Sequence, residues 1–282
     1  MKKITRRSFM AAAGLTVAAL ALTACGGSSS TASSAAASSV ASSAAASSEA
    51  ASAAATELTT VEAGKLTMAT NAAVPPYEMT TDAGEFEGID IETAQAIADK
   101  LGLELQIDDM DFDAALLSVQ QGKADIVMAG VTVTDERKAV MDFSDSYATG
   151  IQSIVVPEGS DIASPDDLAG KKIGTQRGTT GYIYCSDDFG DDNVVAYDDG
   201  LTAVQALNNG QVDAVVIDNA PAKEFVAANP GLVILDTSYA EEDYAIGMAK
   251  GSSLEDAVNA ALEELKADGT LQSIVDKYIT AE

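Results

Sequence analysis

Two residues of opposite charge, Arg137 and Asp218, carry the most specific chemistry in this sequence. A guanidinium can hold a carboxylate through two parallel hydrogen bonds, and a carboxylate can receive an ammonium group. Arg137 follows Thr134, an expected helix N-cap, and therefore lies in a first turn, where an anionic partner offsets the unfavourable dipole. Asp218 ends an apolar strand before a helical stretch, so its side chain can cap that helix, bind a ligand cation, or do both. The alternative for Arg137 is a surface ion pair with Asp135, Asp142 or Asp145.

The sequence has few of the histidine and cysteine residues that could carry out catalysis or bind a metal. The chain has no histidine and two cysteines, Cys25 and Cys185. Ser/His, Cys/His and histidine-based metal chemistry are therefore excluded, and we expect no catalytic residue, no metal and no cofactor. Nothing in the sequence offers Cys185 a base, so it is expected to be a small core residue.

The elements that position these charges alternate between short β-like runs and amphipathic helical patterns, which predicts an α/β architecture. Periodicity and the turn residues between the runs indicate their approximate limits. The predicted strands cover 65–70, 103–107, 125–129, 172–175, 194–197, 212–217 and 232–235, and the clearest helices cover 90–101, 113–121, 254–267 and 271–279.

One segment of the chain echoes another. Residues 115–130 can be laid over residues 203–218 at a constant offset of 88, and each reads as helix, glycine turn, acidic residue and buried strand. This pattern predicts two lobes that contain the same unit. Ligands of such sheets bind beyond the carboxyl ends of the strands, here at Gly130-Val131-Thr132 and at Asp218-Asn219.

The N-terminus is typical of an export signal. Four basic residues precede an apolar run over 9–22, and LTAC at 22–25 resembles a lipobox, which implies removal of 1–24 and lipid attachment at Cys25. TRRSFM at 5–10 also resembles a twin-arginine signal. A plain cleaved signal and an N-terminal membrane anchor remain alternatives. Since the lipid would occupy Cys25, no intrachain disulfide is expected.

Composition separates a tether from a globular head. Residues 26–56 are almost wholly Ser, Ala, Gly and Thr, so we assign 25–60 to the lipidated cysteine and a flexible tether. Four of the 16 basic residues lie in 1–24, which leaves 12 against 44 acidic ones. This charge argues against nucleic acid or anionic lipid as a partner. It weakly favours cationic solutes, although an acidic surface more often serves solubility.

The head, over about 66–279, resembles the polar amino acid binding family of periplasmic solute-binding proteins (bacterial extracellular solute-binding protein family 3). The resemblance implies a two-lobed periplasmic-binding-protein fold, each lobe a central β-sheet flanked by helices, joined by a two-segment hinge. It is carried by ATNAAVPPYE at 69–78, GIDI at 88–91, MDF at 110–112, AGVTVTDER at 129–137, MDFSDSY at 141–147, GKKIG at 170–174, RGTT at 177–180 and VDAVVID at 212–218.

Two crossovers are expected between the lobes, near 147–151 and near 241–246. The first lobe would then comprise 61–150 plus 245–282, and the second lobe 151–244. A two-segment hinge permits closure around a ligand that touches both lobes.

The resemblance assigns the anion clamp to Arg137 and the ammonium partner to Asp218. Thr132, with the backbone of Gly130, is expected to complete the carboxylate cradle from the first lobe. Thr179 and Thr180 are expected to close it from the second lobe, where the turn at Gly178 presents backbone N–H groups at a helix start. The alternative for these residues is ordinary turn and capping chemistry.

The side-chain pocket departs from the family pattern. Many members have an acid or serine where Asn71 stands and an aromatic residue where Val74 stands. Phe112 is therefore expected to be the remaining aromatic wall, with Tyr77 in the pocket or behind it as core. Gln176 is the expected selector from the second lobe.

We therefore expect an extracytoplasmic, lipid-anchored, monomeric protein that binds an amino acid and delivers it to the permease of an ABC importer. The neutral side chains of Asn71 and Gln176 favour a neutral polar or compact amino acid, whereas Glu78 and the acidic surface keep a cationic one open. Two alternatives are a lipoprotein that presents its ligand to a chemoreceptor and a dehydratase-like enzyme on the same fold. The absence of histidine disfavours the enzyme.

Overall fold

The structure is a computed structural model that describes residues 58–279. The export signal, the lipidation at Cys25 and most of the tether lie outside the described residues, so those predictions stay predictions. No helix between residues 58 and 279 is long and apolar enough to span a bilayer.

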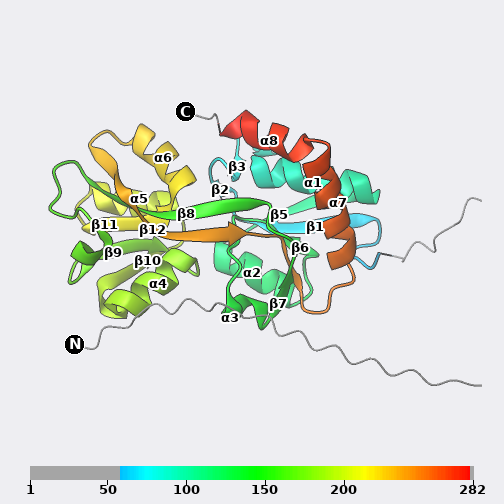
Figure 1. Ribbon diagram of the computed structural model, residues 1–282, viewed down its shortest axis with the longest axis horizontal. Coiled ribbons are helices and arrows are strands. Elements are labelled where there is room, and N and C mark those ends of the chain that lie inside the picture. Colours follow the sequence, from blue (N-terminus) through cyan, green and yellow to red (C-terminus); the bar gives the residue numbers. More distant parts are fainter. Residues whose placement is uncertain (1–57, 280–282) are drawn as a thin grey trace, which may run out of the picture. The chain divides into compact units, whose positions relative to one another are not determined.

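The first sheet is mixed and has the strand order β5-β1-β6-β13-β7. Its strands are β1 (Lys65–Thr70), β5 (Glu104–Asp109), β6 (Ile126–Val127), β7 (Met141–Phe143) and β13 (Gly247–Ala249). Figure 1 shows helices on both sides of it. One face packs on α1 (Ile89–Leu101), α7 (Glu255–Ala267) and α8 (Thr270–Tyr278), and the other on α2 (Phe112–Gln120).

The second sheet is also mixed, with the order β10-β9-β11-β8-β12. It contains β8 (Ala148–Pro157), β9 (Ile173–Gln176), β10 (Val194–Tyr197), β11 (Ala214–Asp218) and β12 (Leu232–Tyr244). One face packs on α5 (Gly200–Asn208) and α6 (Asn219–Ala228), and the other on α4 (Thr180–Phe189). These two layered units confirm the predicted α/β class, and we refer to them as the first and second lobe.

The chain passes between the two sheets twice. The first passage lies between β7 and β8, and the second lies between β12 and β13. The two passages are neighbours because β8 and β12 pair antiparallel as far as Ala148 and Tyr244. The lobe limits expected from the sequence, 61–150 plus 245–282 and 151–244, stay a prediction.

The internal echo corresponds to one structural unit used in both sheets. Gly122 and Gly210 end the helices with φ of 66° and 67°, a backbone conformation that favours glycine. Asp125 then accepts a hydrogen bond from the backbone N–H of Thr67, and Asp213 accepts one from that of Lys172. Each acid thereby ties its own strand to the start of the neighbouring parallel strand, which explains why both units need an acidic residue at that position.

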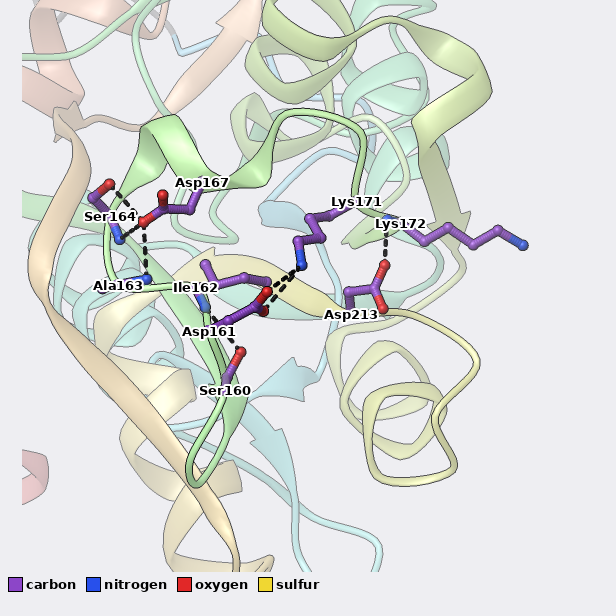
Figure 2. A network of polar contacts seen from close by, with 9 residues as sticks. All are labelled: Ser160, Asp161, Ile162, Ala163, Ser164, Asp167, Lys171, Lys172 and Asp213. Carbon is purple, nitrogen blue, oxygen red and sulfur yellow. Dashed lines mark hydrogen bonds and ion pairs between the residues drawn. The ribbon is translucent and has the colours of Figure 1, made fainter.

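A further segment is held by local polar contacts rather than by a sheet. Asp167 Oδ2 accepts hydrogen bonds from the backbone N–H groups of Ala163 and Ser164 and from the Ser164 hydroxyl, as Figure 2 shows. These bonds lower the pKa of Asp167. Lys171 pairs with Asp161 at 3.0 Å across the same segment. The contacts fix the path from β8 to β9, whose carboxyl end reaches the cleft described below.

The main difference from the predicted elements lies in the pair of long strands. The sequence prediction ended a strand at 235, whereas β12 continues to Tyr244, with register irregularities between Ile234 and Ala240. No strand was predicted over β8, which is ten residues long. The irregular register explains the first difference, because it interrupts the two-residue alternation that identifies a strand. Cys185 is fully buried in the core beneath α4, as predicted, and burial raises the pKa of its thiol to about 12.

Candidate functional site

One cleft between the lobes gathers ten of the eleven candidate ligand-binding residues. From the first lobe it is lined by Val74, Tyr77, Phe112, Gly130, Thr132 and Arg137, and from the second by Gln176, Thr179, Thr180 and Asp218. The eleventh, Asn71, lies beside the cleft through its contact with Gln176. The lining positions lie at or just beyond strand ends and in the first turns of helices, the place where ligands bind in such sheets.

Arg137 is buried in the first turn of α3 (Asp135–Lys138), with 7% of its surface exposed. Thr134 caps this turn as predicted, since its hydroxyl accepts the Arg137 N–H at 3.1 Å. The guanidinium lies over the Phe112 ring, 5.5 Å from its centroid. Burial lowers the pKa of Arg137, and the nearby charge of Glu242 opposes that shift.

Within the described part of the chain, the Arg137 guanidinium has no close anionic partner. It donates from Nη1 to the Thr132 carbonyl at 2.8 Å and from Nη2 to the Gly178 carbonyl at 3.1 Å. No carboxylate of residues 58–279 lies within 4.0 Å of it. The alternative of a surface ion pair is therefore wrong, and Asp142 instead pairs with Lys250 at 2.6 Å. A buried guanidinium in this state has N–H groups left for an anion.

Asp218 ends β11 and caps α6, and it also faces the cleft. Its Oδ1 accepts the Ala220 N–H at 2.9 Å, and its Oδ2 accepts the Ile151 N–H at 3.0 Å and the Tyr244 hydroxyl at 2.8 Å. Burial raises the pKa of Asp218, and these three hydrogen bonds, that of Tyr244 first, oppose the rise. Because a carboxylate has about four lone-pair sites, one acceptor position is left for a ligand donor.

The residues of the predicted carboxylate cradle make contacts that differ in part from those expected. The Gly130 N–H points away from a ligand, because it donates to Asp90 at 3.0 Å. The Thr179 hydroxyl caps α4 by accepting the Tyr182 N–H, so capping occurs there as the alternative stated. Thr180 holds the first position of α4, where the backbone N–H has no partner within the helix. The hydroxyls of Thr132 and Thr180 both donate to Glu242.

The neutral amides of Asn71 and of the predicted selector Gln176 bind each other across the lobes. Gln176 Nε2 donates to Asn71 Oδ1 at 2.8 Å, and Asn71 Nδ2 donates to the Met110 carbonyl at 3.1 Å. Asn71 is thereby oriented by backbone, and both amides are buried. Val74, Tyr77 and Phe112 provide the less polar surface of the same cleft. The binding roles of all these residues stay predictions.

Three polar residues of the cleft region were missed from the sequence: Gln152, Glu242 and Tyr244. They stand on β8 and β12, the strands that sequence periodicity did not resolve. A local signal was present, since buried Glu242 and Tyr244 alternate with exposed Glu241 and Asp243. The Tyr244 ring occupies the space above Gly150, where an added Cβ would lie 2.1 Å from the ring.

Two acidic residues, Glu78 and Asp90, are buried behind the cleft. The presence of Glu78 in the sequence had kept a cationic ligand open as an alternative. Glu78 is fully buried and does not line the cleft. It lies beside Asp90, which accepts the Tyr147 hydroxyl at 2.7 Å and the Gly130 N–H. Burial raises the pKa of Asp90 to about 6 and raises that of Glu78 well above its ordinary value.

Wild type is expected to lose stability as pH rises, and Glu78→Gln is expected to lack the part of this loss that comes from Glu78. Because burial raises its pKa, Glu78 in the folded protein keeps its proton to higher pH than in the unfolded chain, where the ordinary value is 4.5. The stabilisation from this group is therefore full below that pH and is lost as pH rises toward the folded pKa. In that window the slope is up to about 1.4 kcal/mol per pH unit. Urea unfolding of wild type and variant from about pH 5 to about pH 8 measures the difference.

The matched control is Glu85→Gln, an exposed acid in the neighbouring turn. It is expected to keep the wild-type slope. Parallel curves for wild type and Glu78→Gln would show that Glu78 is ionised in the folded protein.

The family model of the bacterial extracellular solute-binding proteins, family 3, matches residues 66–281. The L-cystine-binding protein TcyJ of Escherichia coli (strain K12) is 34% identical over 226 residues, which are 78% of this chain and 85% of TcyJ. The arginine-binding extracellular protein ArtP of Bacillus subtilis (strain 168) is 34% identical over 228 residues, 77% of this chain and 87% of ArtP.

Solved structures match as well. The arginine-, lysine-, histidine-binding protein ArtJ of Geobacillus stearothermophilus superposes with a TM-score of 0.74 at 34% identity, over 77% of this chain and 96% of ArtJ. An ancestral arginine-binding protein bound to glutamine superposes with a TM-score of 0.74 at 42% identity, over 78% of this chain and all of that protein.

Proposed function

This chain belongs to the bacterial extracellular solute-binding proteins, family 3, and we propose that it captures a free amino acid between its lobes and delivers it to an ABC importer. The observation that carries the proposal is the pair of buried charges in one cleft. Arg137 offers guanidinium N–H groups that no carboxylate of residues 58–279 pairs with, and Asp218 offers a remaining acceptor position. An α-amino acid supplies the matching carboxylate and ammonium group.

Closure of the lobes is the proposed means of capture. The passages between the sheets lie side by side at the ends of β8 and β12, an arrangement that lets one lobe rotate against the other. A ligand that touches Arg137 and Asp218 bridges the lobes, and it favours closure only as far as it binds the closed form better. We place the lobe limits at 61–150 plus 245–282 and at 151–244.

For the ligand we propose a neutral polar or compact amino acid. The side-chain end of the cleft carries the Asn71–Gln176 amide pair and the surfaces of Val74 and Phe112, and Glu78 is buried behind it. The relatives described above are named for cystine and for arginine. These ligands, together with histidine and glutamine, are therefore the competitors that an experiment must include.

We propose an extracytoplasmic location with lipid attachment at Cys25, and a monomer that meets its permease and the membrane through that anchor. Delivery to a chemoreceptor would use the same capture chemistry. An enzyme is disfavoured because the relatives are binding proteins and because this chain has no histidine. Its described cysteine, Cys185, lies in the core, and no group of metal-ligating side chains is found among residues 58–279.

The proposal is tested by thermal shift of the purified protein, freed of carried-over ligand, against the common amino acids and cystine. A ligand that binds only the folded state raises the melting temperature by mass action. We expect one strong shift, from a neutral amino acid. A shift with arginine or histidine alone would overturn the proposed ligand class, and no shift with any amino acid would overturn amino acid capture.

A further inference from the structure

Glu242 is a buried acid that the capture of an amino acid does not by itself explain. It stands on β12 opposite Gly150 of β8, close to the passage between the sheets. Only 6% of its surface is exposed, although both of its neighbours in the chain, Glu241 and Asp243, are exposed. A buried carboxylate is costly unless its oxygens are hydrogen-bonded, so its partners indicate its role.

Three donors converge on one oxygen of this carboxylate. Glu242 Oε2 accepts the Thr180 hydroxyl at 2.9 Å, Gln152 Nε2 at 3.0 Å and the Thr132 hydroxyl at 3.0 Å. Thr180 and Gln152 belong to α4 and β8 of the second lobe, so they hold Glu242 in place within its own lobe. Thr132 follows β6 of the first lobe, and its bond to Glu242 therefore joins the two lobes.

We propose that Glu242 is a positioning residue that holds the lobes closed, with its carboxylate as a fixed acceptor for the Thr132 hydroxyl. Other side-chain contacts also cross the cleft: the ionised Arg137 donates to the Gly178 carbonyl, and the neutral Gln176 donates to Asn71 Oδ1. The Thr132 and Thr180 hydroxyls lie 3.4 Å apart. Hydrogen bonds to a carboxylate are roughly twice as strong as those between neutral groups. The Glu242 contact is thus expected to contribute more to the closed arrangement than the neutral Gln176–Asn71 bond does.

The contacts with Glu242 also determine which groups of Thr132 and Thr180 are available to a ligand. Each hydroxyl has one hydrogen, and in both threonines it is directed at Glu242. The hydroxyls are therefore not free donors for a ligand carboxylate, which is left to Arg137 and to backbone N–H groups such as that of Thr180. In this respect the inference rests on the proposed function, whereas the effect on lobe closure does not require any ligand.

The first test measures the distance between the lobes without ligand. Spin labels are attached at Leu117→Cys and Ile183→Cys, exposed positions of α2 and α4, the helices whose first turns line the cleft. Glu242→Ala is expected to lower the ratio of closed to open molecules roughly 10-fold or more, the effect of losing one hydrogen bond to a charged group. Glu242→Gln keeps a carbonyl acceptor of the same size and is expected to fall between wild type and Glu242→Ala.

Glu241→Gln is the matched control, since it removes the same charge from the exposed neighbour on β12. It is expected to leave the distance distribution unchanged. The inference is overturned if Glu242→Ala and Glu242→Gln both show the wild-type distribution, or if Glu241→Gln shifts it equally. A fall in melting temperature alone would show a structural role without control of closure.

The second test uses the amino acid identified by the thermal-shift screen. Glu242→Ala is expected to release it at least about 10-fold faster than wild type, because opening precedes release and closure is weakened. An unchanged release rate would count against the inference. If wild type binds no amino acid, the proposed function fails, while the distance measurement still decides the role of Glu242.

Discussion

Arg137→Ala is expected to weaken amino acid binding by about 30-fold to several thousand-fold, the equivalent of roughly 2–5 kcal/mol. The loss is large because the ligand carboxylate would be enclosed in a cleft without its opposite charge. Arg137→Lys keeps the charge but loses the planar fork and its two parallel hydrogen bonds. It is therefore expected to recover only part of the affinity. Titration calorimetry of the folded variants measures both effects.

A second ligand separates the carboxylate contact from general damage to the cleft. Arg137 also bonds the Thr132 and Gly178 carbonyls, so its removal is expected to lower stability as well. The α-amide of the same amino acid lacks the charged carboxylate. Its weaker binding should therefore change much less between wild type and Arg137→Ala. Equal losses for both ligands would contradict the clamp.

The control for Arg137 is Arg177→Ala. Arg177 stands in the turn beside the cleft, but its side chain is half exposed and lies 3.6 Å from Asp198. Exposed pairs of this kind contribute little. Arg177→Ala is expected to bind with near wild-type affinity.

Asp218→Asn is expected to reduce affinity by a similar amount, roughly 2–5 kcal/mol, because the ligand ammonium would lose its counter-charge in the closed cleft. The asparagine retains one side-chain oxygen and is itself a good N-cap, so α6 should still form. The expected result is a large loss of binding together with some loss of stability, because the asparagine Nδ2 cannot accept the Ile151 N–H that Asp218 Oδ2 accepts. Calorimetry measures the loss of binding, and thermal unfolding of the ligand-free protein measures the change in stability.

The pH dependence of binding offers a check on the same residue. Burial raises the pKa of Asp218, and only its ionised form attracts the ammonium group. Affinity should therefore fall as pH is lowered through that pKa, and the fall should disappear in Asp218→Asn. Asp199→Asn is the control, since Asp199 caps α5 through the Thr202 N–H in an exposed position. If Asp199→Asn weakened binding as much as Asp218→Asn, the loss of a negative charge anywhere on this lobe, rather than the contact made by Asp218, would be the cause.

Local signals in the sequence were sufficient for most of the fold. The period of apolar residues located the helices α1, α2, α7 and α8 to within about two residues. Thr134 and Asp218 were recognisable as caps because capping depends on residues a few positions apart. The echo between 115–130 and 203–218 likewise rests on contacts that each unit makes with its nearest strand. Arg137 and Asp218 could be singled out because they follow such local signals and match the family pattern.

Other features depended on pairing between distant segments. Glu242 and Tyr244 belong to a strand whose partner, β8, lies about 90 residues earlier and whose register is irregular. Their contacts with Thr180 and Asp218 need the assembled second sheet, and the contact of Glu242 with Thr132 arises only when both lobes are assembled. The same holds for the Gly130 N–H, which the sequence alone directed at a ligand and which Asp90 accepts instead.

The sequence by itself determined the family, the α/β lobes and the two charges on which binding is expected to depend. Each of these follows from residue type and short-range spacing. Only the tertiary structure decided which hydrogen-bonding groups remain available in the cleft. A donor has a limited number of hydrogens, and whether another part of the protein already receives them is a property of segments that meet in space. Thr132 shows this most directly, because its hydroxyl is directed at Glu242, 110 residues away in the chain.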